Sequence, residues 1–292
     1  MRDTLYIGDY AYSSWSLRGW LLMERFGIGF ASVLVDFARA EVAEQMPEAA
    51  PARTVPTLVT ADGAVIWDSL AMAEELASRY PEAGIWPQDP SLRALARSLA
   101  AEMHSGFAAL RDHCPMNLRC AYLEVPVPEA VDRDLRRIER IWTHALAQSG
   151  GPWLCGAYSA ADAFYAPVAA RIAGYGLKVS DVAQDYVTAH LADPSFRRWR
   201  AMGLVHGQDL PWYAKPYPQQ DWPGPKPLAA RAVETGPAEN ESCPYSGKAV
   251  SHFLEIDGRV FGFCNPFCRD KTVADPEAWP AFTALRAGVA RG

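Results

Sequence analysis

The chain has 292 residues, of which 50% are hydrophobic and 21% are charged. This composition is that of a globular protein, and it excludes disorder over the whole length. The 28 basic residues are outnumbered by 34 acidic ones, for a formal net charge of -6, so a dedicated nucleic-acid binder is not expected. No window approaches the roughly 20 apolar residues of a membrane span, and the N-terminus lacks the apolar run of a secretory signal. We therefore expect a cytoplasmic protein without membrane association.

The first 82 residues alternate strand and helix patterns. Strands are predicted at residues 4–7, 31–35, 57–60 and 65–67, and helices at residues 16–26 and 69–80. The turn Ala61-Asp62-Gly63 joins the last two strands as a hairpin. This order predicts a small mixed sheet with one parallel crossover, one antiparallel hairpin and helices packed on it.

Strand signals are absent from residue 90 to about residue 201, where amphipathic helices are predicted at residues 92–111, 128–148, 160–175 and 181–190. Six prolines then fall within residues 211–227, which predicts an extended connector. Turn and strand signals return at residues 243–247, 253–256 and 260–263. The expected organisation is residues 1–82, an α/β domain; 88–210, an all-helical domain; 211–240, a Pro-rich linker; and 241–288, a small appended module.

Three motifs of the first domain belong together. They are Y-S-S-W-S-L-R at residues 12–18, V-P at residues 55–56 and D-S at residues 68–69. Together they resemble a glutathione transferase, and the serine string resembles that of the zeta-type enzymes. The resemblance covers about residues 4–205. It implies a thioredoxin-like domain, an all-α domain, glutathione as co-substrate, glutathione S-transferase activity and a homodimer.

The serine string fits the chemistry of a thiol enzyme. A free thiol titrates near pH ~8.5, so something must lower its pKa before it attacks an electrophile in the cytosol. A serine hydroxyl can donate to the sulfur, and the start of the first helix adds partial positive charge. By resemblance, Ser13 is the thiolate-stabilising serine and Ser14 its neighbour, with Tyr12 as the main competitor. Serines before helices are also common N-caps, which is the simpler interpretation.

The other two motifs are expected to hold the tripeptide. By resemblance, Val55-Pro56 is the cis-proline site, where the Val55 backbone would bond glutathione as a strand does. Asp68 and Ser69 open a helix, where N–H groups and the Ser69 hydroxyl could hold the γ-glutamyl carboxylate. Taken alone, a trans proline in a loop and an ordinary helix cap explain the same residues.

The expected electrophile pocket lies on the helix that carries residues 102–107, by resemblance the one facing the thiol. Trp15 stands where the zeta-type enzymes carry a cysteine, which argues against the isomerase activity of that class. In the helical domain, Ser159 and Asp162 match a capping box and are expected to be structural.

The C-terminal module contains Cys243, Cys264 and Cys268. The spacing of one distant and two close cysteines, with D-G-R-V-F-G-F before the second, resembles the small treble-clef zinc modules of the TRASH/YHS group. Thiolates from a turn, a strand end and a helix start can converge on Zn²⁺. The three cysteines are therefore candidate zinc ligands.

A closed zinc site needs four ligands, and the fourth is open here. Ser246 occupies the position where related zinc modules have a second cysteine in the first turn. His252 is the nearest alternative donor in sequence, and Asp270 is another. A module that has lost its metal and is held by its hydrophobic residues is the competing interpretation.

The sequence thus predicts an enzyme that conjugates or adds the glutathione thiolate to a small electrophile. Two alternatives stay open. One is a glutathione-dependent isomerase or reductase on the same fold. The other is a non-catalytic protein that binds glutathione and metal, or senses redox state, through its cysteine module.

Overall fold

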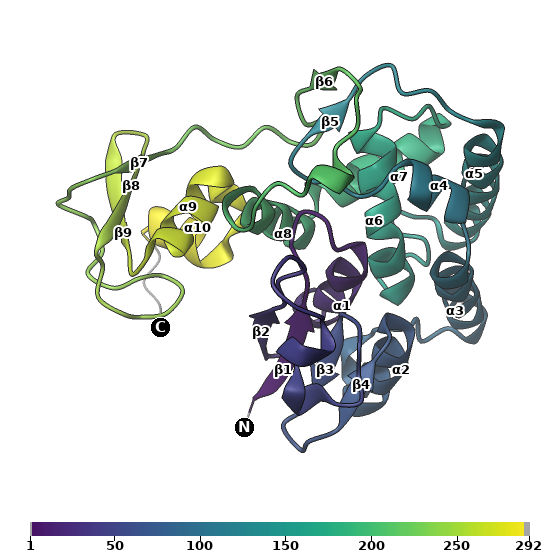
Figure 1. The fold of residues 1–292 in the computed structure, drawn as a ribbon, viewed down its shortest axis with the longest axis horizontal. Coiled ribbons are helices and arrows are strands. Elements are labelled where there is room, and N and C mark those ends of the chain that lie inside the picture. Colours follow the sequence, from purple (N-terminus) through teal and green to yellow (C-terminus); the bar gives the residue numbers. More distant parts are fainter. Residues whose placement is uncertain (1, 289–292) are drawn as a thin grey trace. The chain divides into compact units, whose positions relative to one another are not determined.

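The computed structural model describes residues 2–288 (Figure 1). They pack into two compact units, each formed by two stretches of chain. Unit 1 comprises Met1–Leu191 and Asp209–Gly224, and unit 2 comprises Ala192–Gln208 and Pro225–Gly292. Among the described residues, no helix combines the length and apolar character that a membrane crossing requires.

Unit 1 begins with a four-stranded mixed sheet. Its strands, in the order β2-β1-β3-β4, are β1 (Asp3–Ile7), β2 (Phe30–Leu34), β3 (Thr57–Val59) and β4 (Val65–Trp67). β1 runs parallel to β2 and antiparallel to β3, and β3 forms a hairpin with β4. Leu5 and Leu58 pair at the centre of the sheet and are fully buried. The predicted crossover and hairpin are confirmed.

Two helices accompany this sheet, α1 (Ser14–Glu24) and α2 (Ser69–Arg79). Most of α1 is buried because it packs against both α2 and α6 (Ala160–Gly174). The Val55–Pro56 peptide bond is cis, as expected. A Cβ atom at Gly19 would lie 2.7 Å from Pro56 Cβ, so only glycine allows α1 to approach the proline this closely.

The remainder of unit 1 is largely helical (Figure 1). Besides α6, its helices are α3 (Pro90–Ser105), α4 (Ala108–His113), α5 (Glu129–Ser149) and α7 (Asp181–Ala192). The helix expected over residues 92–111 is broken, because Phe107 adopts a left-handed conformation and α4 starts afresh after it. A two-stranded ribbon pairs β5 (Ala121–Tyr122) with β6 (Gln219–Gln220). Short 3-10 helices lie at Ala43–Gln45, Pro47–Ala49, Pro81–Ala83 and Pro211–Tyr213.

Unit 2 contains a helix that the sequence patterns did not indicate, α8 (Pro194–Val205). Its other elements are β7 (Arg231–Val233), β8 (His252–Ile256), β9 (Arg259–Phe263), α9 (Pro266–Ala274), a 3-10 helix (Pro276–Ala278) and α10 (Pro280–Arg286). The strands form an antiparallel sheet in the order β7-β8-β9.

Helix α8 packs against α9 and the 3-10 helix of unit 2. The Arg197 guanidinium donates to both oxygens of Asp275, at 2.8 and 2.7 Å, and the Arg198 Nη1 donates to the Ala278 carbonyl at 3.0 Å. Phe196 and Trp199 are completely or almost completely buried. Residues 194–205, which were expected to lie in the helical domain of residues 88–210, therefore pack with the C-terminal module.

Candidate functional site

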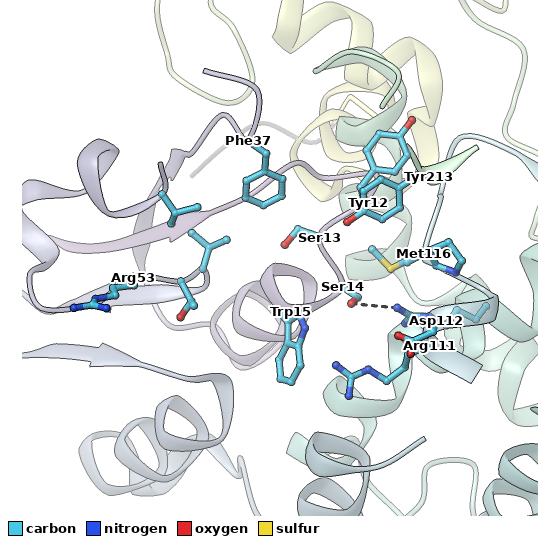
Figure 2. A pocket seen from close by; sticks show the side chains of 15 residues that line it. Tyr12, Ser13, Ser14, Trp15, Phe37, Arg53, Arg111, Asp112, Met116 and Tyr213 are labelled. Carbon is cyan, nitrogen blue, oxygen red and sulfur yellow. Dashed lines mark hydrogen bonds between the residues drawn. The ribbon is translucent and has the colours of Figure 1, made fainter. Parts of the chain in front are cut away.

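Unit 1 contains a cavity of about 390 Å³ at the N-terminus of α1. Residues 12–15 and the loop at residues 53–55 form part of its wall, together with residues from the start of the helical segment and from α6 (Figure 2). Side chains far apart in sequence therefore meet around one space. Its volume is in the range of small-molecule sites.

Ser13 is the N-cap of α1. Its Oγ accepts a hydrogen bond from the Ser16 amide at 3.4 Å, and its hydroxyl donates to Ser16 Oγ at 2.8 Å. Ser16 Oγ in turn accepts from the Gly8 amide at 2.9 Å. The hydroxyl hydrogen of Ser13 is thus already used within the protein, although Ser13 lies on the cavity wall.

Ser14 is placed differently. Its Oγ accepts a hydrogen bond from Arg171 Nη2 at 3.3 Å, drawn as a dashed line in Figure 2. Because Arg171 supplies the donor in this pair, the hydroxyl hydrogen of Ser14 remains available to a ligand atom. Burial lowers the pKa of Arg171 to about 10, so the guanidinium stays charged at neutral pH and polarises the hydroxyl.

The Arg171 side chain is held rigidly on α6. Its Nε donates to the Cys114 carbonyl at 2.9 Å and its Nη1 to the Pro167 carbonyl at 3.1 Å. Only 5% of the residue is exposed. The two backbone acceptors leave Nη2 directed at Ser14, which fixes the geometry of the pair.

Tyr12 is the alternative to Ser13 and Ser14 as the residue that would stabilise the thiolate. Its hydroxyl oxygen accepts a 3.4 Å hydrogen bond from the Leu210 amide, and its ring lies 4.7 Å from that of Tyr213. Burial raises the pKa of Tyr12, so its phenol ionises less readily than that of a free tyrosine. This phenol is engaged with residues 209–213 of unit 1, in contrast to the hydroxyl of Ser14.

Positive charge prevails on the cavity wall. Arg53, Arg111 and Arg171 line it, against Asp112 as the one lining carboxylate among the described residues. The Arg111 guanidinium carbon lies 4.8 Å from the centre of the Trp15 ring, a cation–π contact. Trp15 thus supports a cationic group at the cavity.

Of the four residues expected to bind glutathione, the structure places one on the cavity wall and three outside it. Val55 lines the cavity, whereas Pro56, Asp68 and Ser69 are not among its lining residues. Asp68 caps α2 through a 2.8 Å bond from the Leu70 amide, and its other oxygen lies 3.1 Å from Nε2 of His104.

Ser69 has no exposed surface, and its hydroxyl oxygen has no hydrogen-bond partner in the part of the chain that the structure describes. Buried polar atoms in proteins usually have a hydrogen-bond partner. Ser69 therefore keeps an unused hydrogen-bonding group at the start of α2.

Residues 102–107, expected to line the electrophile pocket, do not line this cavity. Glu102 instead forms two hydrogen bonds with Arg137, at 2.7 and 2.9 Å, and His104 meets Asp68. The chain breaks after α3, and the cavity is lined instead by residues beyond that break: Arg111, Asp112, Pro115 and Met116. Sequence reasoning missed Arg111 and Arg171; the signal for Arg171 was a lone arginine in the otherwise apolar run of α6.

In unit 2 the structure brings the three C-terminal cysteines together. The Sγ atoms of Cys243, Cys264 and Cys268 all lie within 4.8 Å of one another. Cys243 sits in a tight turn, in which the Gly247 amide donates to the Cys243 carbonyl at 2.9 Å. Cys264 follows β9 and Cys268 lies in the first turns of α9. The sequence prediction that a turn, a strand end and a helix converge is confirmed for these atoms.

Neither alternative fourth donor joins the cysteine cluster. Among residues 2–288, the group of potential ligand atoms contains the three sulfurs alone. The Nδ1 atom of His252 lies 3.0 Å from Ser251 Oγ, and Asp270 accepts from Arg269 Nε at 2.7 Å. Both side chains are thus engaged elsewhere.

Comparisons with known proteins agree with this architecture. Residues 12–79 match the family of the glutathione S-transferase N-terminal domain. A stretch of 104 residues is 34% identical to a probable maleylacetoacetate isomerase of Caenorhabditis elegans, covering 36% of this chain. The match spans about half of that relative, 48% of its length.

Solved structures show the same fold at low identity. A glutathione transferase homolog from Burkholderia, solved with bound glutathione, is 24% identical with a TM-score of 0.52, over 68% of this chain and 95% of its own. Glutathione transferase Omega 3C from Trametes versicolor is 19% identical with a TM-score of 0.54, over 73% of this chain and 92% of its own. The chain has the glutathione transferase fold, a thioredoxin-like α/β domain followed by a helical region, and a cysteine cluster follows near the C-terminus.

Proposed function

We propose that this protein is a glutathione-dependent enzyme of the glutathione transferase family that acts on a small anionic electrophile. The observation that carries the proposal is the pair of Ser14 and Arg171 on the wall of the cavity at the start of α1. The family match and the glutathione-bound structural relative support glutathione as the co-substrate.

In this proposal Ser14 donates a hydrogen bond to the glutathione sulfur. The N-terminus of α1 adds positive charge there, and Arg171 polarises the hydroxyl, so the thiolate is favoured over the thiol. Ser13 serves as the helix cap. Val55 would contact the cysteinyl backbone, Pro56 would hold Val55 at the strand end, and the start of α2 with Asp68 and Ser69 would receive the γ-glutamyl group.

The charge of the cavity supports an anionic second substrate. Three arginines face one carboxylate on its wall, and a carboxylate ligand would form charge-assisted hydrogen bonds with them. The C. elegans relative is named as a probable maleylacetoacetate isomerase, and maleylacetoacetate carries carboxylates, which supports this choice.

Isomerisation is therefore a second candidate. In it the thiolate adds to a double bond and is expelled after rotation, so glutathione is not consumed. Conjugation consumes one glutathione for each product. Trp15, in place of the zeta-type cysteine, favours conjugation. Following glutathione by thiol titration during turnover of unsaturated carboxylates distinguishes the two reactions.

The replacement Arg111→Gln is expected to raise KM for an anionic electrophile about 10-fold to 100-fold, because a charge-assisted contact contributes about 1.5–3 kcal/mol. KM for glutathione and turnover of a neutral electrophile should change little. Steady-state kinetics with a matched carboxylate and methyl ester measure this difference.

The matched control is Arg137→Gln, since Arg137 binds Glu102 away from the cavity. It should leave both substrates unaffected. Equal losses for the carboxylate and the ester in Arg111→Gln would contradict the anionic substrate while leaving the glutathione assignment in place.

We further propose that the C-terminal module, of the TRASH/YHS type, binds a thiophilic metal ion such as Zn²⁺. Three sulfurs from a turn, a strand end and a helix lie close enough to share one ion, with only moderate adjustment to Zn–S distances near ~2.3 Å. When bound, zinc would join the turn, β9 and α9 into one framework. Cys243, Cys264 and Cys268 would hold it.

Purified protein is expected to carry about one zinc per chain, measured by elemental analysis without chelators. Cys264→Ser should lower this content and increase hydrogen exchange in residues 241–282, while turnover with glutathione stays nearly unchanged. Cys120→Ser, a cysteine of unit 1, is the control and should keep the metal. Metal-free protein with three freely titrating thiols in the module would contradict the proposal.

Two further expectations from the sequence stay predictions, the homodimer and the cytoplasmic location. Sedimentation of the purified protein tests the first.

A sensor in place of an enzyme would be favoured if removal of the metal abolished glutathione turnover.

A further inference from the structure

The cysteine cluster supplies three of the four ligands that a closed zinc site needs, and Ser246 lies beside it. Ser246 lies three residues after Cys243, at the end of the same turn. Its hydroxyl donates to Cys264 Sγ at 3.2 Å and its Oγ accepts from the Lys248 amide at 3.4 Å. Asn265 also contacts this sulfur, since its Nδ2 donates to Cys264 Sγ at 3.4 Å. Neither neighbour is a fourth sulfur ligand, and a neutral hydroxyl is a poor ligand for a thiophilic ion.

The corner next to Ser246 is also the side that faces solvent. Cys243 and Cys268 are buried, at 1% and 8% exposure. Cys264 is partly exposed, and its neighbours Ser246 and Asn265 are exposed. An ion held by the three sulfurs would therefore be closed on the protein side and reachable from outside at one position.

The charge near the cluster suits an additional anion. Three thiolates and a divalent ion carry a net charge of -1, and a fourth thiolate would make it -2. Lys271 lies one helical turn after Cys268, and its ammonium group is held 4.2 Å from the centre of the Tyr245 ring and 4.1 Å from that of Trp279. Lys271 also acts electrostatically on Cys268, so this fixed cation offsets one unit of the charge.

We propose that the metal site of the module is an open three-thiolate site, whose fourth position takes the thiolate of a small exogenous thiol. This inference rests on the proposed metal binding. On binding, the thiol would give its proton to solvent, and its sulfur would take the fourth position in place of solvent, beside the thiolates of Cys243, Cys264 and Cys268. No electrons are transferred, and no protein bond breaks. Sulfur is the donor that an ion already bound to three thiolates prefers.

Co²⁺ bound to the full chain is the probe, because its sulfur-to-metal absorption grows with the number of thiolate ligands. Without added thiol, the protein should show the intensity of three thiolates. Reduced glutathione should raise it by about one third, toward a four-sulfur tetrahedral site. S-methylglutathione, which can occupy the cavity of unit 1 but has no thiol, should cause no change.

Two variants of Ser246 sharpen the test. Ser246→Cys should show the four-thiolate spectrum without added thiol and should no longer respond to glutathione. Ser246→Ala should retain the response of the unchanged protein, and it serves as the check where Ser246→Cys does not fold.

The outcomes separate this inference from the metal proposal. Co²⁺ that binds but gives a spectrum indifferent to glutathione would overturn the open position. A response to S-methylglutathione equal to that of glutathione, or a spectrum altered by His252→Ala, would do the same. Failure of the unchanged protein to bind Co²⁺ or Zn²⁺ would instead overturn the metal proposal itself.

Discussion

Replacing Ser14 with alanine is expected to lower kcat about 100-fold while KM for glutathione changes little. Removal of a single well-placed donor from a developing or stabilised anion typically costs about 10²–10³ in rate. The hydroxyl acts on the sulfur alone, so it favours thiolate over thiol and contributes little to binding the rest of the tripeptide. A loss in kcat without a matching rise in KM follows.

The thiol itself provides the more direct measurement. Thiolate absorption of bound glutathione, titrated against pH, gives the sulfur pKa in the complex. In Ser14→Ala this pKa should rise by about 1–2 units, equal to about 1.4–2.8 kcal/mol. The rise of kcat with pH should move by the same amount, because the reaction requires the deprotonated sulfur.

Two controls separate Ser14 from its surroundings. Ser14→Thr keeps the hydroxyl and should keep most of the activity. Ser13→Ala removes the α1 N-cap and should lower the free energy of unfolding by about 1 kcal/mol while leaving the sulfur pKa unchanged. The opposite pattern, an inert Ser14→Ala and an inactive Ser13→Ala, would return the role to Ser13.

Asp162→Ala is expected to lower the free energy of unfolding by about 3–5 kcal/mol. Asp162 is completely buried and accepts hydrogen bonds from the amides of Leu154 and Ser159, at 3.0 and 2.8 Å, and from Tyr186 Oη at 2.7 Å. The Ser159 hydroxyl adds a fourth bond at 3.1 Å. Alanine leaves several buried donors unpaired, each at a cost of about 1–3 kcal/mol.

The contribution of Asp162 to the free energy of unfolding is expected to decrease with rising pH. Burial raises the pKa of Asp162 to about 6 from 3.8, although its hydrogen bonds oppose the shift. The folded protein therefore binds this proton more tightly than the unfolded chain, and the contribution of Asp162 to stability decreases as pH rises from about 4 to 6. Asp162→Asn should lack that decrease, which urea denaturation at several pH values can measure.

Asp181→Ala provides the control for an ordinary acidic residue in a first helical turn, since Asp181 is exposed at the start of α7. It should change stability by less than about 0.5 kcal/mol. A comparable small change in Asp162→Ala would show that the four hydrogen bonds are not a stabilising network.

Much of the sheet domain could be predicted from sequence because its signals are local. The strand patterns at β1, β3 and β4 and the turn at Asp62-Gly63 depend on neighbours within a few residues, and they matched the observed pairing. The capping box of α6 is equally local, and both of its reciprocal bonds are present.

The errors arise where distant packing decides the conformation. Gly106, the C-cap of α3, was a local signal for the end of that helix, but a left-handed conformation at the bulky Phe107 that follows is not indicated by its residue type. Helix α8 did carry a signal, an aspartate N-cap followed by Pro194 at the first helical position. Its amphipathic pattern is weak, however, so the periodicity did not predict a helix. α8 is stabilised by contacts with a segment more than 60 residues later in the chain.

Part of the candidate site could be predicted from local motifs. Ser13, Ser14 and Val55 were chosen from sequence, and the structure places all three on the wall of one cavity; their roles stay predictions. Arg171 is 157 residues from Ser14, so no spacing rule could pair them. The choice between the two serines depends on this arginine and on the N-cap bonds of Ser13, which only the fold reveals.

The way the chain is shared between the two units bears on how such a protein can be shortened, in the laboratory or in evolution. The backbone passes from one unit to the other three times, near residues 191, 208 and 224. A stop codon after residue 208 would delete the module yet leave α8 behind, without α9 and the 3-10 helix against which it packs. A protease cut at residue 216 would give two fragments that each carry pieces of both units, so the nicked protein should stay together. Because α8 packs against α9 and the 3-10 helix of unit 2, removal of the C-terminal module by simple truncation is expected to destabilise the chain that remains.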